Sequence, residues 1–333
     1  MLLLNRLGSV TTTSLSEIDL SVGLAGGWLA NPTLLASGVA GESVESLLSA
    51  IKAGAGGAVS KSIGLKPRRG YPDPTVVPLD SGTINAVGLS NPGAASFSKR
   101  LDSLKRSDAP TTIIVSVFGG SPAEFSKVVR TLDGKNFAGY ELNLSCPHVE
   151  GVGTEVGHDP ELVARVVRAV KSATGKPVFA KLSPNTERIL EVARAAVDEG
   201  VDGITAINTV RAMMMIDVES QRPVLSHRTG GLSGSAIRPI ALRCVYELSE
   251  EFEVPIMGVG GISMWDHAVE FLLAGATAVQ VGTAASGKYG LFRKIVEGIG
   301  GYIRRKGFRT VAEITGLAHR GWACRTCSFT ARS

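Results

Sequence analysis

Short runs of apolar and β-branched residues alternate with segments of helical periodicity through most of the chain. Eight such runs lie at residues 34–37, 58–63, 112–118, 140–145, 178–183, 203–208, 255–260 and 278–283. Between them, apolar residues recur every three or four positions, as over residues 160–174 and 187–199, which predicts amphipathic helices. Asp159 before Pro160, and Ser121 before Pro122, are residue pairs typical of a helix start.

This pattern predicts an α/β fold. Eight strand and helix units in a chain of 333 residues favour a closed (β/α)8 TIM barrel, with a short N-terminal β extension and long loops over the mouth at the carboxyl ends of the strands. A doubly wound open sheet is the alternative that the pattern leaves open. We expect a single domain over residues 1–333, with a peripheral C-terminal tail from about residue 306.

Two predicted connections are longer than a strand and helix unit requires. Residues 64–111 carry so many prolines and glycines that their first half cannot be helical, and long ordered loops are usually functional. Residues 209–234 contain three consecutive methionines, which we interpret as packing residues. The Gly-Gly-Leu-Ser-Gly segment at 230–234 is expected to form a loop that brings backbone amides close to an anion.

The composition narrows the possible functions. The chain is 44% hydrophobic and 20% charged, which is typical of a globular protein, and its net charge of +5 is spread widely. Such mild basicity suits a small anionic ligand better than nucleic acid. No 18-residue apolar stretch predicts a membrane span, no His or Cys spacing predicts a metal site, and four scattered cysteines do not predict a disulfide framework. We therefore expect a cytoplasmic location.

Polar residues and glycines fall where the predicted strands end. Lys61, Asn143, Lys181 and Asn208 lie at or near four strand ends, where barrel active sites form. A lysine that extends to solvent at the rim is the alternative for both lysines. Gly260-Gly261 ends the seventh predicted strand, and Gly282-Thr283 ends the eighth. These are the two places where barrels commonly bind phosphate through backbone N–H groups. The lysines and asparagines favour binding of a planar, anionic, amide-rich molecule over a hydrolytic reaction. The glycines favour a phosphorylated ligand or cofactor.

Cys146 follows the fourth predicted strand directly and precedes Pro147. Strand ends that lead into loops are where α/β enzymes place reactive groups. Most free cysteines, however, are small buried hydrophobes. The local pattern does not decide between the two interpretations.

Several segments together resemble the class 1 dihydroorotate dehydrogenases, in the same order and with the same spacing over about residues 17–305. They are Lys61-Ser62, the Asn-Ala-Val-Gly-Leu-Ser-Asn-Pro-Gly segment at 85–93, Asn-Leu-Ser-Cys-Pro at 143–147, Ala-Lys-Leu-Ser-Pro at 180–184, Asn208-Thr209, the 230–234 segment and Gly260-Gly261. Residues 216–218, 222–225 and 232–237 are more similar to the 1B branch. In that branch the catalytic subunit passes electrons to a partner subunit with FAD and an iron–sulfur cluster.

The resemblance implies oxidation of dihydroorotate to orotate in pyrimidine (UMP) biosynthesis, with FMN as cofactor and a homodimer or heterotetramer as assembly. It implies that Cys146 takes the C5 proton while hydride passes from C6 to FMN N5. The implied cofactor-binding residues are Ala36, Ser37, Lys61, Ser62, Ser116, Asn143, Lys181, Ile207, Gly234, Gly260, Gly261, Gly282 and Thr283. The implied substrate-binding residues are Lys61, Asn85, Val87, Gly88, Leu89, Asn143, Asn208 and Thr209.

Two positions depart from the family pattern, and one motif lies outside it. His148 and Ser116 stand where relatives usually place asparagine, so their roles do not transfer directly. Cys324 and Cys327 form a C-x-x-C pair that we interpret as part of a surface tail, with contact to an electron-transfer partner as the alternative. An FMN reductase of the dihydropyrimidine or dihydrouridine type, and a non-enzymatic phosphate-binding barrel, remain as alternatives. The electron acceptor is left open.

Overall fold

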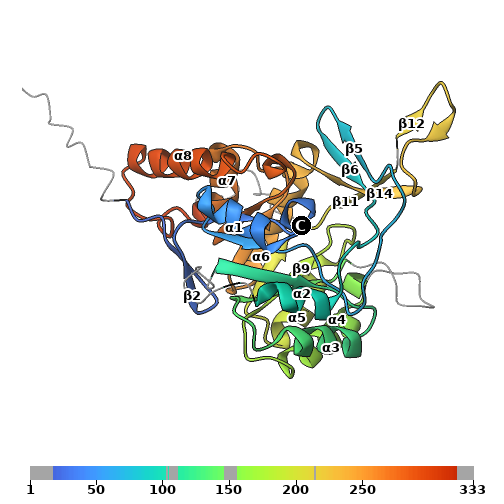
Figure 1. The fold of residues 1–333 in the computed structure, drawn as a ribbon. Coiled ribbons are helices and arrows are strands. Elements are labelled where there is room, and N and C mark those ends of the chain that lie inside the picture. The colour runs from blue at the N-terminus through green and yellow to red at the C-terminus, as the bar shows by residue number, and fades with distance from the viewer. Residues whose placement is uncertain (1–17, 103, 105–111, 146–155, 214, 321–333) are drawn as a thin grey trace, which may run out of the picture.

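Eight parallel strands form a closed barrel in this computed structural model, which describes residues 18–102, 104, 112–145, 156–213 and 215–320 (Figure 1). Around the barrel, each strand pairs with the next and the last pairs with the first, so the predicted TIM barrel is confirmed and the open sheet is wrong. In chain order the strands are β3 (Thr33–Leu35), β4 (Gly57–Val59), β7 (Ile113–Val117), β8 (Gly139–Asn143), β9 (Val178–Leu182), β10 (Gly203–Ala206), β15 (Ile256–Val259) and β16 (Ala278–Val281).

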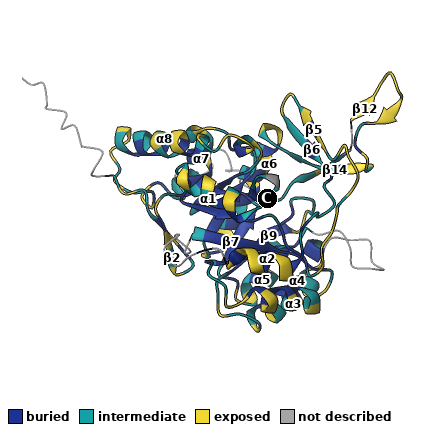
Figure 2. Cartoon of the chain, in the orientation of Figure 1, coloured by how far each residue is buried: buried dark blue, intermediate teal, exposed yellow. Residues whose placement is uncertain are grey.

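Helices surround the barrel and turn their apolar faces to it, so that burial alternates along each helix (Figure 2). The predicted helix starts are confirmed: Asp159 Oδ1 accepts from the Glu161 and Leu162 amides at 3.0 and 3.3 Å, and Ser121 Oγ accepts from Glu124 N at 3.3 Å. The helices are α1 (Val44–Lys52), α2 (Ala94–Leu101), α3 (Pro122–Leu132), α4 (Pro160–Lys171), α5 (Ile189–Asp198), α6 (Arg238–Glu251), α7 (Trp265–Leu273) and α8 (Leu291–Arg305). Short 3-10 turns lie at Val39–Gly41, Val156–His158, Ser235–Ile237, Thr283–Ala285 and Leu317–His319. No helix of the described ranges is long and apolar enough to cross a membrane.

The strands are buried on both faces, as expected for a parallel sheet covered by helices. Tyr140 on β8 shows how strand and helix are tied together, because its hydroxyl donates to the carbonyl of Val129 on α3 at 3.1 Å. Burial, with a smaller contribution from the nearby Asp133, raises the pKa of Tyr140 above its ordinary value. The phenol therefore stays neutral and keeps its donor role.

Both ends of the described chain pack against the barrel. The predicted N-terminal β extension is the antiparallel hairpin of β1 (Val22–Leu24) and β2 (Gly27–Leu29), which lies on the side away from β5, β6 and β12 (Figure 1). Val311 and Ile314 belong to the hydrophobic core. The stretch expected as a peripheral tail from about residue 306 therefore packs against the core at these two positions. Residues 321–333 lie outside the described part of the chain.

The two long connections meet in a separate antiparallel sheet. Its strands, in spatial order, are β11 (Val210–Met213), β14 (Thr229–Ser233), β6 (Gly82–Asn85) and β5 (Val76–Leu79), and the hairpin of β12 (Ile216–Asp217) and β13 (Arg222–Pro223) extends from it. The segment at 230–234, expected as a loop, is mostly strand β14. Its glycines are required by close packing, since a Cβ on Gly230 would lie 2.7 Å from Asn85 O and one on Gly231 would lie 2.1 Å from Thr209 Oγ1.

One buried side chain, Asn91, holds the long connection that follows β4. Its Oδ1 accepts from Gly64 N at 3.1 Å and from Gly93 N at 2.8 Å, and its Nδ2 donates to Leu89 O at 2.9 Å. The side chain thus ties the beginning of the connection to its middle. Residues 87–89 depend on this anchor for their position.

We expect Asn91→Ala to leave two buried amides without an acceptor, which costs about 2 kcal/mol. Thermal unfolding should show a Tm lowered by several degrees, and limited proteolysis should show faster cleavage within residues 64–93. Asn136→Ala is the matched control, because Asn136 Nδ2 is buried without a hydrogen-bond partner among the described residues. Equal Tm values for the two variants would contradict the anchoring role.

Candidate active site

Polar side chains from four neighbouring strand ends meet at the mouth of the barrel. Ser62 stands at the centre: its Oγ lies 2.9 Å from Ser116 Oγ and 3.5 Å from Ser37 Oγ, and it accepts from Asn143 Nδ2 at 3.1 Å. Ser37 and Ser62 follow β3 and β4, Ser116 is the last but one residue of β7, and Asn143 ends β8. The structure therefore brings together residues that are far apart in the sequence.

The same network continues to the end of β10. Asn143 Oδ1 accepts from Asn208 Nδ2 at 3.1 Å and from Ser145 N at 3.3 Å, and Asn208 Oδ1 accepts from Thr209 N at 2.8 Å. Each amide is held in one orientation by these bonds. Six of the predicted site residues thus form one array of neutral donors and acceptors, which suits a flat ligand with ring amide groups.

Lys181 lies beside Asn143 in the register of β8 and β9 and is 5% exposed. Its Nζ lies 3.3 Å from Oε1 of Glu141, a carboxylate that is fully buried. A buried lysine is costly without a counter-charge, and Glu141, which the sequence reasoning missed, supplies one here. The available signal was a single glutamate inside the apolar run at 140–144.

Lys61 also has an acidic partner that the sequence reasoning missed. Its ammonium pairs with the Glu42 carboxylate at the rim, and its backbone N–H donates to Gly41 O at 2.8 Å. The Lys61 side chain is 14% exposed and that of Glu42 is 54% exposed. Because Glu42 is open to solvent, the pair leaves Lys61 accessible to another carboxylate.

Asn85 approaches the mouth from the separate sheet. Its Nδ2 donates to Gly231 O at 3.1 Å, and Gly231 packs closely against the Thr209 side chain. This arrangement places Asn85 near the end of the network described above. It is the contact between the two long connections that brings these residues together.

The loop after β6 contains the predicted residues Val87, Gly88 and Leu89. Gly88 and Leu89 both adopt positive φ, of 70° and 57°. A side chain on Gly88 would meet the Tyr71 ring and backbone at 2.8 Å, and Tyr71 N donates to Val87 O at 3.2 Å. Tyr71 in turn stacks on His227 with ring centroids 4.4 Å apart. The loop is therefore shaped by packing as well as by Asn91.

A pocket of about 200 Å³ lies where β14, β15 and β16 lead into their following turns. It is lined by Asp80, Ser81, Gly82, Gly234, Ser235, Gly261, Ile262, Ser263, Gly282, Thr283 and Ala284. Four predicted cofactor residues, Gly234, Gly261, Gly282 and Thr283, are among them. The hydroxyls of Ser81, Ser235 and Ser263 were missed, since an isolated serine in a turn carries no distinctive pattern. Gly260 has a different environment, because a Cβ there would lie 2.6 Å from Ala241 Cβ on α6.

This pocket fits a phosphate group. Glycine backbone and the hydroxyls of Ser81, Ser235, Ser263 and Thr283 line it beside the turns that precede α6 and α7, where N–H groups favour an anion. Asp80, Ile262 and Ala284 complete the lining. A Cβ on Gly282 would lie 3.5 Å from Ala36 Cβ, so the pocket adjoins the end of β3 and hence Ser37. Ile207, another predicted residue, is buried, and its N–H donates to Val259 O at 2.9 Å. The pocket and the hydrogen-bond network are thus two parts of one mouth.

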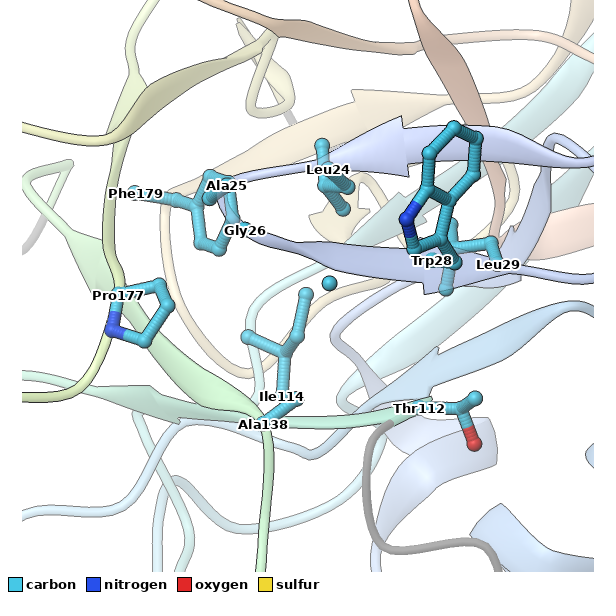
Figure 3. A pocket seen from close by; sticks show the side chains of 11 residues that line it. Leu24, Ala25, Gly26, Trp28, Leu29, Thr112, Ile114, Ala138, Pro177 and Phe179 are labelled. Atoms are coloured by element: carbon cyan, nitrogen blue, oxygen red, sulfur yellow. The ribbon is translucent and has the colours of Figure 1, made fainter.

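A second pocket, of about 240 Å³, lies at the other end of the barrel (Figure 3). The β1–β2 hairpin covers it, and Thr112, Ala138 and Pro177 at its base precede the strands β7, β8 and β9. Its lining is mostly apolar, with Thr112 as a polar side chain, and includes no titratable side chain. The chemistry of the site therefore belongs to the opposite mouth.

Some sequence predictions fall outside the described residues. Cys146, His148, Cys324 and Cys327 are among them. Within the described ranges, no group of three or more His, Cys, Asp or Glu side chains is placed to hold a metal ion. Cys244, on α6, is a buried packing residue whose thiol pKa is raised by burial.

Comparison with known proteins places these features in a family. Residues 19–303 match the family model described as dihydroorotate dehydrogenase. Dihydroorotate dehydrogenase B (NAD(+)), catalytic subunit, from Pyrococcus furiosus is 50% identical over 304 residues, 91% of this chain and 100% of that protein. The proteins of the same description from Thermococcus kodakarensis and Methanosarcina mazei are 48% and 47% identical, over 90% and 89% of this chain and 98% and 94% of their own lengths. The chain therefore belongs to the dihydroorotate dehydrogenase family.

Proposed function

We propose that this chain is the catalytic subunit of a 1B-type dihydroorotate dehydrogenase, an FMN-dependent oxidoreductase that converts dihydroorotate to orotate in pyrimidine biosynthesis. Family membership over residues 19–303 supports the reaction. The observation that carries the proposal is the construction of the mouth. It combines a neutral array of amides and hydroxyls, a buried lysine and a pocket of phosphate size.

The residues of the mouth fit FMN. The pocket around Gly234, Gly261, Gly282 and Thr283 would hold the phosphate, with Gly260 packing the adjacent turn against α6. Ala36, Ser37, Ser62, Ser116 and Ile207 would surround the ring system, together with Asn143. Lys181 would lie toward the N1/O2 edge, where a positive charge favours the reduced, anionic ring. When bound, FMN supplies the hydride acceptor for the substrate.

The substrate is a ring with two amide groups and a carboxylate. Asn143, Asn208, Asn85 and Thr209 offer amide and hydroxyl groups that match the ring amides. The loop at Val87–Leu89 would cover the ring from the side of the separate sheet. Lys61 would bind the substrate carboxylate in exchange for Glu42, because that partner is largely in solvent.

Cys146 supplies the base in this proposal. Its thiolate takes the proton from C5, hydride leaves C6, and the electron pair of the C5–H bond forms the new C5=C6 double bond. A thiol does this near neutral pH only if its surroundings favour the thiolate. His148, two residues further on, replaces an asparagine of the family and would donate a single hydrogen bond.

The electrons leave the chain through a partner in this proposal. Similar proteins are described as catalytic subunits of an NAD(+) enzyme, which supports a second subunit. We propose that this partner carries FAD and an iron–sulfur cluster, in a heterotetramer built on a homodimer of this chain, in the cytoplasm. The C-x-x-C pair at 324–327 stays an expected part of a surface tail, with contact to this partner as the alternative.

The phosphate site is tested by charge at Thr283, which is exposed at the pocket wall. Thr283→Asp and Thr283→Asn differ in charge but hardly in size, and both remove the 2.8 Å hydrogen bond to Ser233 Oγ. We expect Thr283→Asp to bind FMN at least tenfold more weakly than Thr283→Asn, because the carboxylate repels the phosphate. Riboflavin, which lacks the phosphate, should bind the two variants equally. The same FMN affinity in both, measured by fluorescence titration, would contradict this placement of the phosphate.

The base is tested by bleaching of the flavin absorption on addition of dihydroorotate. General base catalysis contributes roughly 100- to 10,000-fold, so Cys146→Ser should slow bleaching at pH 7 by about this factor. The rate in the variant should recover partly at high pH, because serine is a much weaker acid than cysteine. Cys244→Ala is the control: Cys244 is a buried packing residue of α6, so its substitution should leave the bleaching rate unchanged. Equal rates in Cys146→Ser and the wild type would remove Cys146 from the mechanism.

A further inference from the structure

The interior of the barrel contains one pair of opposite charges. Across all eight barrel strands, the only charged residues are Glu141 on β8 and Lys181 on β9. Glu141 is fully buried and Lys181 is 5% exposed. The two groups therefore face each other in a low-dielectric environment.

The three hydrogen bonds to the Glu141 carboxylate come from three different strands. Lys181 Nζ lies 3.3 Å from Oε1, while Oε2 accepts from Thr205 Oγ1 on β10 at 3.1 Å and from Gln280 Nε2 on β16 at 2.9 Å. Gln280 Nε2 also lies 3.5 Å from the sulfur of Met257 on β15. An ammonium, a hydroxyl and an amide N–H are all donors, so this set of partners fits an ionised carboxylate.

Stability does not explain this pair. Removing two charges from water costs several kcal/mol for each ion, and buried ion pairs are often no better than apolar side chains of the same volume. Aliphatic residues fill most of the remaining strand interior, so an apolar pair would fit. The position of the pair is informative: Glu141 lies two residues before Asn143 on β8, and Lys181 is level with Asn143. The carboxylate is thus one layer below Asn143, and the ammonium that lies against it belongs to a residue level with Asn143.

We propose that Glu141 is a positioning residue that keeps Lys181 protonated and fixed in place before negative charge develops on the flavin. This inference rests on the proposed function, because it assigns a role toward the bound FMN. In the reaction, dihydroorotate loses two electrons and one proton to FMN as hydride, and the reduced ring carries one negative charge. With Glu141 present, Lys181 is already an ammonium ion, so reduction draws no further proton from solvent.

Without the carboxylate, Lys181 would be a buried ammonium ion with no counter-charge on any barrel strand while the flavin is oxidised. It would release its proton and regain it when the ring becomes anionic. Reduction would then take up two protons for two electrons instead of one. Glu141 thereby separates the charge state of Lys181 from the redox state of the flavin.

The test is the pH dependence of the flavin midpoint potential in the FMN-loaded chain, measured by spectroelectrochemistry over the range in which the reduced flavin is anionic. Each proton taken up with two electrons gives a slope of about 30 mV per pH unit, so we expect about 30 mV for the wild type and about 60 mV for Glu141→Gln. Glu141→Asp keeps the charge and should restore the smaller slope. A merely structural role for Glu141 would leave the slope of Glu141→Gln at the wild-type value, which would overturn the inference.

Asp202→Asn is the matched control for loss of an ion pair. Asp202 Oδ2 lies 2.8 Å from Lys171 Nζ and also accepts from Val178 N, at the amino-terminal end of β9 and away from the mouth. This variant should keep the wild-type slope. Thr205→Val is the alternative variant if Glu141→Gln does not fold, because it removes only one hydrogen bond from the Glu141 carboxylate. Its slope should lie above the wild-type value but below 60 mV per pH unit, as about 60 mV is expected for complete loss of the charge. A slope equal to that of the wild type would overturn the inference.

A second measurement is independent of the flavin. In the full chain labelled with 13C at the lysine side chains, Lys181→Arg identifies the Lys181 signal, and a pH titration follows its protonation. Lys181 should lose its proton at lower pH in Glu141→Gln than in the wild type, even if the chain binds no flavin. An unchanged titration overturns the inference whatever the cofactor, whereas absence of FMN binding with a shifted titration contradicts only the proposed function.

Discussion

Closure of the barrel is the constraint on which the rest of the molecule depends. Eight parallel strands that pair in a ring must direct their carboxyl ends to one mouth, so residues far apart in the chain meet there. Ser62 and Asn143 are 81 positions apart, and Asn143 and Asn208 are 65 apart, yet each pair shares a hydrogen bond. The site is therefore a property of strand register. A shift of one residue in any strand would point its polar side chain into the surrounding helices.

The neutral polar groups of the mouth and the ion pair in the barrel interior are held in place in different ways. At the mouth, the side chains of Ser62, Ser116, Asn143 and Asn208 hold one another in place at little cost, because each of them has a hydrogen-bond partner. One layer below Asn143, the Glu141 carboxylate pairs with Lys181 and accepts from Thr205 and Gln280. A positive charge fixed in this way costs no reorganisation when a ligand becomes anionic, which is the advantage of a preorganised site.

The sequence predicted the features that depend on local patterns. Strand and helix positions follow from periodicity, and Asn143, Lys181 and Asn208 could be predicted as site residues because they lie at or near strand ends. The rest depends on tertiary packing. The glycines at 230–231 favour a loop by their intrinsic propensity. In the structure they lie in strand β14, where neighbouring segments approach so closely that there is no room for a side chain. Val311 and Ile314 are buried by contacts with distant elements, and neither Glu42 nor Glu141 reveals its lysine partner in the sequence.

The two lysines of the site show how burial adapts one residue type to two tasks. Each pairs with a carboxylate, but the Glu42 side chain is 54% exposed whereas that of Glu141 is fully buried. An ion pair with one partner in solvent is held less tightly than a buried pair, so the substrate carboxylate of the proposed reaction would replace Glu42 at small cost. Breaking the buried pair would leave an uncompensated charge, which costs several times more. Lys61 is therefore suited to a ligand that binds and leaves in every cycle, and Lys181 to one that stays.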